Sequence, residues 1–267
     1  MAGLAFLLFL LVLALFAGWI APQDPLAQQL ALRLKPPSWQ HWLGSDDYGR
    51  DQLSRLIYGT RATFLAALEA VAIGVVLGVP LGLIAGYFGG LMDIVLSRLM
   101  DALMSTPALI LALTIVAVLG FGLVNAMAAV GIVIAPRFFR VMRSATQDVR
   151  QETYIEASNA LGASTGRILF HHVLPNVLSP LVVQVSVTLG AAVNAEAGLS
   201  FLGVGVRIPD PSWGSMLTTA ASNITLAPHL VWAPGIMIAV TVLAFTVLGD
   251  GLRQAMGTRR LPAAEEA

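Results

Sequence analysis

Six apolar stretches, each close to the length of a membrane-spanning helix, constrain this 267-residue chain more than any other feature. A helix needs about 20 apolar residues to cross the hydrocarbon core of a bilayer. The stretches occupy residues 4–20, 62–88, 94–119, 121–139, 176–204 and 230–249. In lipid, backbone polar groups must be satisfied internally, and a helix does this within one segment. We therefore predict an all-α membrane protein with six transmembrane helices.

The composition agrees with a lipid-facing surface and excludes several classes of protein. Only 11% of the residues are charged and 57% are hydrophobic, whereas about a quarter of a soluble domain is charged. A net charge of zero provides no basic surface for nucleic acid. The chain has no cysteine, which excludes disulfides and thiolate metal sites.

Polar segments divide the chain into three regions. Residues 1–60 should hold a first transmembrane helix and an outer, periplasmic segment, and residues 61–255 a core of five transmembrane helices interrupted by a polar loop at about 140–172. Residues 256–267 should form a cytoplasmic tail. The first stretch has no preceding Lys or Arg and no clear cleavage site, so we expect a retained helix; a signal peptide is the alternative.

Loop charges favour both termini in the cytoplasm. Positively charged residues are concentrated on the cytoplasmic side of membrane proteins. The 140–172 loop and the tail share one side if six helices span the membrane, and together they carry Arg140, Arg143, Arg150, Arg167, Arg253, Arg259 and Arg260. Five positive charges in or beside the 21–60 segment oppose this assignment: Arg33, Lys35, Arg50, Arg55 and Arg61.

The 140–172 loop should contain a short amphipathic helix. At 100° per residue, one face carries Tyr154, Ala157 and Leu161, and the opposite face carries Glu152, Glu156 and Asn159. Amphipathic helices lie on lipid headgroups or bind partner proteins. Periodicity leaves both uses open for this loop.

A sharp turn should follow that helix. Gly162 suits the left-handed conformation that ends many helices. Ser164 or Thr165 can cap a second short helix running to about His172, and Pro175 suits the first turn of the fifth span. The expected result is two short helices at a turn on the arginine-rich side.

The residues of this loop resemble a known family. Glu156-Ala157-Ser158, then Gly162, then Leu174-Pro175 are similar to the EAA loop of ABC importer permeases, although Ser158 replaces the usual second alanine. Stretches 43–51, 54–59, 86–90, 196–203, 211–214 and 248–253 resemble, in order, the six-span permease of the dipeptide, oligopeptide and nickel branch.

The resemblance implies a fold, a function and partners. The fold would be that of a type I ABC importer permease with a cytoplasmic coupling-helix loop, multi-pass in the bacterial inner membrane. The chain would form the pathway with a second, homologous permease. Two cytoplasmic ATPases would dock on the loop, and a periplasmic or lipid-anchored binding protein would deliver di- or oligopeptides. The implied docking residues are Tyr154, Glu156, Ala157, Ser158, Leu161 and Gly162.

The chain should not hydrolyse ATP itself. It has no Gly-x-x-x-x-Gly-Lys-Ser/Thr sequence, and its single lysine, Lys35, lies in the outer segment. We therefore expect a transport subunit rather than an enzyme, with no cofactor of its own and with ATP and Mg²⁺ bound by partner subunits. His171 and His172 point about 100° apart on a helix and make a poor chelate, so we assign no metal.

Polar side chains inside spans are costly and usually face the protein interior. The fifth span carries three candidates for lining the pathway: Gln184, Asn194 and Glu196. An interhelical hydrogen bond is the alternative role for each of them.

Other polar residues have local interpretations. Glu69 should either extend toward the membrane surface or pair with Arg61. Asp101 should pair with Arg98 one turn earlier, and Pro107 should kink the third span.

Two other functions and one regional question stay open. An ion-coupled secondary transporter would show inverted repeats and broken helices, and we find no such pairing. A non-transporting scaffold is disfavoured by the polar residues of the fifth span. The outer segment 21–60 either contacts the binding protein or covers the outer mouth.

Overall fold

The computed structural model describes residues 2–207 and 209–257 of the chain. The expected cytoplasmic tail, with Arg259 and Arg260, therefore lies outside the described residues from position 258 onward. Within the described ranges the regular elements are all helices, and the nearest approach to a sheet is a single bridge between Ser45 and Asp51. The all-α prediction is confirmed.

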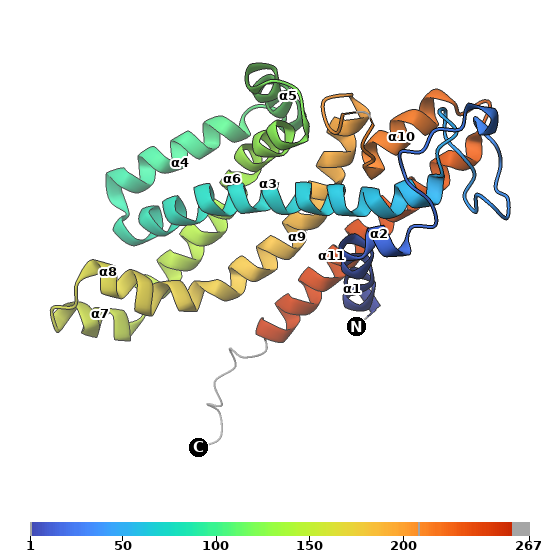
Figure 1. Cartoon of the computed structure of the whole chain (residues 1–267). Helices are drawn as coiled ribbons and strands as arrows, with labels where there is room; N and C mark the ends of the chain where they lie inside the picture. Colours follow the sequence, from blue (N-terminus) through green and yellow to red (C-terminus); the bar gives the residue numbers. More distant parts are fainter. Residues whose placement is uncertain (1, 208, 258–267) are drawn as a thin grey trace.

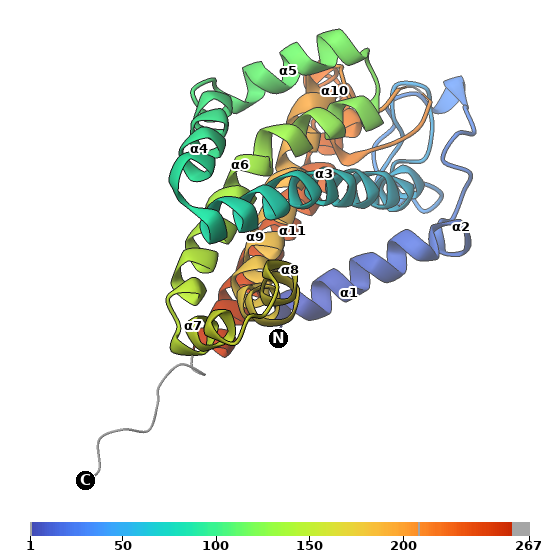
Figure 2. The ribbon, with the colours of Figure 1, turned by 90° about the vertical axis from the view of Figure 1, so that its left-hand side faces the viewer.

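The helices form a bundle in which most connections are short and the one from α2 to α3, residues 21–51, is a long loop (Figures 1 and 2). The α-helices are α1 (Ala2–Leu15), α2 (Ala17–Ile20), α3 (Gln52–Phe88), α4 (Gly90–Met104), α5 (Ala108–Leu119), α6 (Leu123–Arg150), α7 (Thr153–Ala160), α8 (Thr165–Arg167), α9 (Leu174–Phe201), α10 (Trp213–Ser222) and α11 (Trp232–Gly257). Two 3₁₀ turns, η1 (Leu30–Leu32) and η3 (Pro228–Val231), and one π-helical segment, η2 (Ile168–Val173), complete them.

Among the described residues, four helices are long and apolar enough to cross a membrane: Gln52–Phe88, Leu123–Arg150, Thr165–Phe201 and Pro228–Met256. The pair α4 and α5 passes the same test together but is bent by 91°. Pro107 stands directly before α5, so the predicted break at this proline is confirmed. Gly3–Leu15 is a shorter apolar helix. Up to five spans are thus supported by length, and the predicted six are not confirmed.

Two helices extend well beyond their apolar stretches. α3 begins at Gln52, ten residues before the predicted span, and α6 continues to Arg150, eleven residues beyond it. The polar segments 21–60 and 140–172 therefore include end turns of these two helices. Hydropathy marks the part of a helix that faces lipid, whereas these polar turns project beyond it.

A row of glycines lets α3 and α6 pack with their backbones in contact. Gly74, Gly78, Gly82 and Gly86 recur every four residues and therefore share one face of α3. A Cβ atom on Gly82 would lie 2.6 Å from the Phe139 carbonyl oxygen, and one on Gly86 equally close to the Arg143 carbonyl oxygen. Small residues that permit such close approach are a general basis of helix association in membranes.

The remaining helices build around this pair. α9 packs against α3, α6 and α11, while α1 packs against α3 and α11. In Figure 1, α7 and α8 lie near the end of α3 that carries Phe88, and α10 lies at the opposite end. The bundle therefore has one end formed by α7 and α8, called the inner end below, and one formed by α10 and the segment 21–51, called the outer end.

Candidate functional site

The inner end carries a small helical elbow, residues 151–164, in which α7 connects α6 to the helix that leads into α9. Ile155 anchors it: its side chain is completely buried in the same core cluster as Val149, Ile168 and Val173. The predicted apolar face of Tyr154, Ala157 and Leu161 does not include this anchor. The sequence signal for the anchor is Ile155 itself, a large apolar residue directly beside the predicted face. Because α7 is too short to bury residues on two sides, only one of these apolar groups can face the core.

The predicted docking residues form the exposed surface of this elbow. Leu161 is 88% exposed and Tyr154 is 42% exposed. Glu156 and Ala157 are also exposed, and the half-buried Ser158 donates its hydroxyl to the Tyr154 carbonyl oxygen at 2.7 Å. Leu161 is too exposed to stabilise the fold of this chain by packing, and Ile155 already holds the elbow in place.

Gly162 adopts the predicted left-handed turn, with φ at +80°. Its amide donates to the Asn159 carbonyl oxygen at 3.0 Å, and a Cβ atom at this position would meet no atom within 4 Å. The conformation, rather than space, therefore favours glycine.

The prediction of a separate second short helix, from Ser164 or Thr165 to about His172, is wrong. From Thr165 the chain runs as one 37-residue helix to Phe201, and the Ser164 side chain forms no capping bond. Its Ile168–Val173 segment is π-helical. The π-helical segment ends two residues before Pro175, and its wider turn accommodates this proline, which lacks an N–H, without a break in the helix.

The elbow is also tied to α9 by side chains. Asn176 donates to the Tyr154 hydroxyl oxygen at 3.1 Å, and the Tyr154 and His172 rings meet edge to face. Burial, with the Glu152 carboxylate adding to it, raises the pKa of the Tyr154 hydroxyl, so this group stays neutral at physiological pH. Among the described residues, no group of three or more His, Cys, Asp or Glu could hold a metal ion.

The three polar residues of the fifth span do not share one environment. Asn194 is exposed and Gln184 is half-buried, donating to the Thr188 hydroxyl at 3.0 Å. They lie on one stripe of α9, spaced by three and four residues, which also contains Val187, Ala191, Gly198 and Phe201, all exposed or half-buried. Within this chain the stripe is only partly covered.

Glu196, in contrast, is completely buried in the interior. Its carboxylate accepts the Ser200 hydroxyl at 2.7 Å and the Thr63 hydroxyl at 3.3 Å. The Thr63 oxygen in turn accepts the backbone N–H of Trp213 at 3.3 Å. Glu196 therefore joins α9 to α3 and, through Thr63, to the first turn of α10.

Toward the inner end, a groove of about 820 Å³ lies between α6, α9 and α11, and its lining includes Pro180, one helical turn before Gln184. The groove is lined by Arg140, Val141, Ser144, Ala145, Asp148, Val149, Pro175, Asn176, Ser179, Pro180, Val183, Arg253 and Met256. Arg140 also pairs with Asp101 at 2.7 Å. The predicted Asp101–Arg98 pair is therefore wrong, because α4 and α6 lie close enough for a bond between helices.

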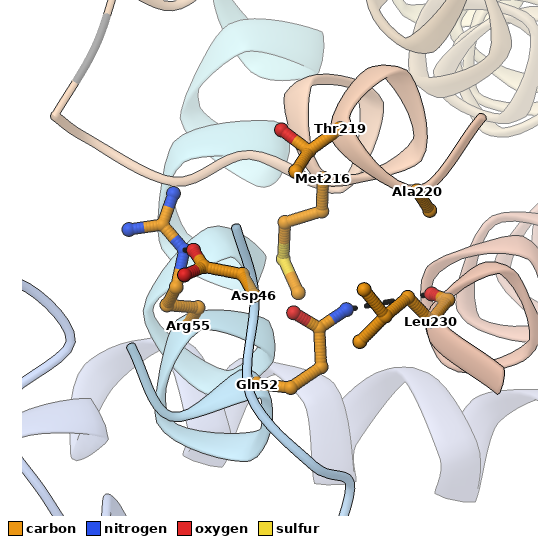
Figure 3. A pocket seen from close by; sticks show the side chains of 7 residues that line it. All are labelled: Asp46, Gln52, Arg55, Met216, Thr219, Ala220 and Leu230. Atoms are coloured by element: carbon orange, nitrogen blue, oxygen red, sulfur yellow. Dashed lines mark hydrogen bonds and ion pairs between the residues drawn. The ribbon is translucent and has the colours of Figure 1, made fainter. Parts of the chain in front are cut away.

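The outer segment is fastened to the bundle by buried charges. Arg55 contacts the Asp46 carboxylate at 3.2 Å, and its guanidinium donates to the carbonyl oxygens of Pro25 and Pro209. Figure 3 shows Asp46 and Arg55 side by side at a narrow pocket, with Gln52 bonded to the Leu230 carbonyl oxygen across it. These contacts join the 21–51 segment and α3 to the region around α10.

Glu69 does not form the predicted pair with Arg61. It lies half-buried on α3, and no ion pair or hydrogen bond connects it to another described residue. The other surface groups of the outer segment include Trp39, which is 97% exposed, and Trp42, which is 67% exposed.

Comparisons with protein families match most of the chain. Residues 78–261 match the family described as binding-protein-dependent transport system inner membrane component. Residues 1–37 match the N-terminal transmembrane domain of oligopeptide transport permease C.

Curated relatives align over nearly the whole chain. The di/tripeptide transport system permease protein of Pseudomonas aeruginosa (strain UCBPP-PA14) is 42% identical over 262 residues, which cover 96% of this chain and 86% of the relative. The glutathione transport system permease protein of Shigella flexneri serotype 5b is 44% identical over 257 residues, covering 96% of this chain and 85% of the relative.

Solved structures share the fold. The MetNI methionine ABC transporter, in an inward-facing conformation, aligns with a TM-score of 0.60 and 23% identity over 75% of this chain and 95% of the matched chain. An amino acid ABC transporter solved with histidines aligns with a TM-score of 0.54 and 20% identity over 78% and 94% of the two chains.

Proposed function

Because the chain belongs to the family of binding-protein-dependent transport system inner membrane components, we propose that it forms, with a second homologous permease, the pathway of an ATP-driven importer of short peptides. Its role as a permease subunit of an inner-membrane ABC importer follows from the family and from relatives 42–44% identical to it. Short peptides are the proposed cargo because those relatives are di/tripeptide and glutathione permeases.

The observation that carries the proposed coupling is the exposed apolar surface of the elbow. Leu161, Tyr154 and Ala157 form this surface, which the chain itself leaves uncovered. Exposed apolar surface with a polar border is typical of protein interaction sites, and Glu156 and Ser158 supply that border. Two cytoplasmic ATPases that bind ATP and Mg²⁺ are the proposed occupants, one on this elbow and one on that of the second permease. The chain's termini would then both face the cytoplasm.

The partly exposed stripe of α9 is the proposed wall of the pathway. Gln184 and Asn194 lie on it and can present amide groups to a solute or to the second permease. Polar groups in a membrane helix usually face the protein interior or a water-filled space. Glu196, although expected to line the pathway, already has its partners inside this chain, so we propose that it holds the wall in position.

Substituting Leu161 tests the coupling. Leu161→Glu removes an exposed apolar contact and adds a charge, so we expect the purified permease to stay folded but to lose its ATPase subunits. Burying an unpaired carboxylate at an interface costs several kcal/mol. Co-purification of the ATPases with a tagged chain and uptake of a labelled dipeptide into proteoliposomes give the two readouts.

Leu226→Glu is the matched control, since Leu226 is 73% exposed near the outer end. This control should retain its ATPases. Normal ATPase retention by the Leu161→Glu variant would contradict docking on the elbow. Uptake driven by an ion gradient without ATPases would instead identify a secondary transporter, and retention of partners without any uptake would identify a scaffold.

A further inference from the structure

The inner groove of α6, α9 and α11 carries one free charge of each sign. Arg253 on α11 and Asp148 on α6 both line the groove and are exposed. The ion pairs of the described residues involve other side chains and leave both of these groups unpaired. The second groove arginine, Arg140, is instead held by Asp101.

Neutral hydrogen-bonding groups lie in the same groove. Ser144 and Ser179 are exposed there, and their hydroxyls bond to no other described residue. The groove volume of about 820 Å³ is within the usual range of small-molecule sites, about 300–1,000 Å³. An arginine favours a carboxylate through paired hydrogen bonds, and an aspartate favours an ammonium group.

We propose that this groove is a binding site for a short zwitterion, such as a dipeptide, whose carboxylate binds Arg253 and whose ammonium group binds Asp148. The proposal rests on the proposed transport function, because Pro180 and Val183, which line the groove, lie next to Gln184 on α9. A solute that leaves the pathway toward the inner end reaches this site last.

The chain itself provides a clean reporter, since it contains no cysteine. Ser179→Cys places a single thiol in the groove of this chain, and the rate of maleimide labelling then reports occupancy. The assembled complex, reconstituted in phosphatidylglycerol nanodiscs, is labelled with and without dialanine, N-acetyl-dialanine or dialanine amide. We expect dialanine to slow labelling and the two blocked compounds, each lacking one charge, to protect about tenfold less well, as for the loss of one charge-assisted hydrogen bond.

Two variants in the Ser179→Cys background should remove the protection. Arg253→Gln and Asp148→Asn are each expected to raise the half-protecting dialanine concentration about tenfold. Arg98→Gln is the matched control, because Arg98 is an exposed arginine outside the groove and should leave protection unchanged. Ser144→Cys serves as the reporter if Ser179→Cys does not assemble.

Three results would overturn the proposal. Equal protection by dialanine and both blocked compounds, or none by any of them, would exclude charge recognition. Loss of ATPase subunits from the Arg253→Gln complex with protection intact would assign Arg253 to that interface. Protection by added phosphatidylethanolamine but not by dialanine would assign the groove to a lipid headgroup with the same two charges.

A parallel uptake measurement separates this proposal from the proposed function. A complex that imports dialanine while its groove thiol labels at an unchanged rate overturns the groove site alone. A complex that imports no peptide overturns the proposed function.

Discussion

Ile155 and Leu161, six residues apart in the elbow, have opposite roles. Ile155 is completely buried and connects α7 to the core, whereas Leu161 is 88% exposed. The residue that positions the elbow and the residue proposed to bind the ATPase are therefore distinct. Substitutions at Leu161 can test function without changing the fold, while substitutions at Ile155 would change both.

Glu196 provides a prediction at the residue scale. Glu196→Ala removes the acceptor for the Ser200 and Thr63 hydroxyls, and unsatisfied buried polar groups cost about 1–3 kcal/mol each. We expect a lower midpoint of thermal unfolding in detergent. Glu196→Gln keeps one acceptor oxygen and should cost less.

Asn194→Ala is the matched control for this measurement, because Asn194 is exposed two residues earlier on the same helix. It should unfold at the wild-type temperature. If Glu196→Ala does so as well, the carboxylate does not hold the three helices together.

The polar residues of the fifth span are evident from the sequence, but their different environments are not. Glu196 and Asn194 differ by two positions, or about 200° around a helix, so at most one could face a given neighbour. Which one faces inward depends on the partners Thr63 and Ser200, and Thr63 is 133 residues distant in sequence. The turn at Gly162 was predictable because it depends on local backbone conformation alone.

At the scale of helices, apolar stretches located the membrane core of each long helix but not its ends. Arg55 lies in the first three turns of α3, before the apolar stretch begins. It is buried by contacts with the outer segment, not by lipid. The 91° bend before α5 was signalled by Pro107. The ten-residue helix α10 lies between the fifth and sixth apolar stretches and is too short for a span, so apolar length did not predict it, although the Ser212 capping box marks its start.

The glycine row of α3 gives a prediction at this scale. Gly82→Ala would place a methyl group 2.6 Å from the Phe139 carbonyl oxygen and force α3 and α6 apart. Overpacking of this kind costs about 1–3 kcal/mol. The variant should unfold at a lower temperature and yield less assembled complex.

Gly235→Ala on α11 controls for the change of residue type, because a Cβ atom there would meet nothing within 4 Å. The two variants should therefore differ clearly in unfolding temperature. Equal unfolding temperatures would show that contact between α3 and α6 does not depend on this row.

For the whole molecule, the outer segment is an integral part of the bundle. Arg55 alone connects Asp46, Pro25 and Pro209, which lie far apart in the sequence. These contacts favour the interpretation that the 21–51 segment covers the outer end in a fixed position. Trp39 and Trp42 are exposed on this segment and remain available for a binding protein or the lipid interface.

Arg55→Met should release this cover. The substitution leaves the carbonyl oxygens of Pro25 and Pro209 without this donor, whereas Asp46 keeps its ion pair with Arg50 at 2.7 Å. An unsatisfied buried polar group costs about 1–3 kcal/mol. We expect faster hydrogen exchange across residues 21–51 in the purified complex, with little change in α7. Arg61→Met, at an exposed arginine of the same helix, is the control. Unchanged exchange in Arg55→Met would show that other contacts suffice.

The unbroken helix from Thr165 to Phe201 has a mechanical consequence. Its 37 residues extend about 55 Å at 1.5 Å per residue, nearly twice the thickness of the hydrocarbon layer. Because one continuous helix joins the elbow to the far end of α9, a displacement of the elbow is transmitted along α9 unless the helix bends. The π-helical segment Ile168–Val173, between the elbow and the apolar part of the helix, is the place where such bending is expected first.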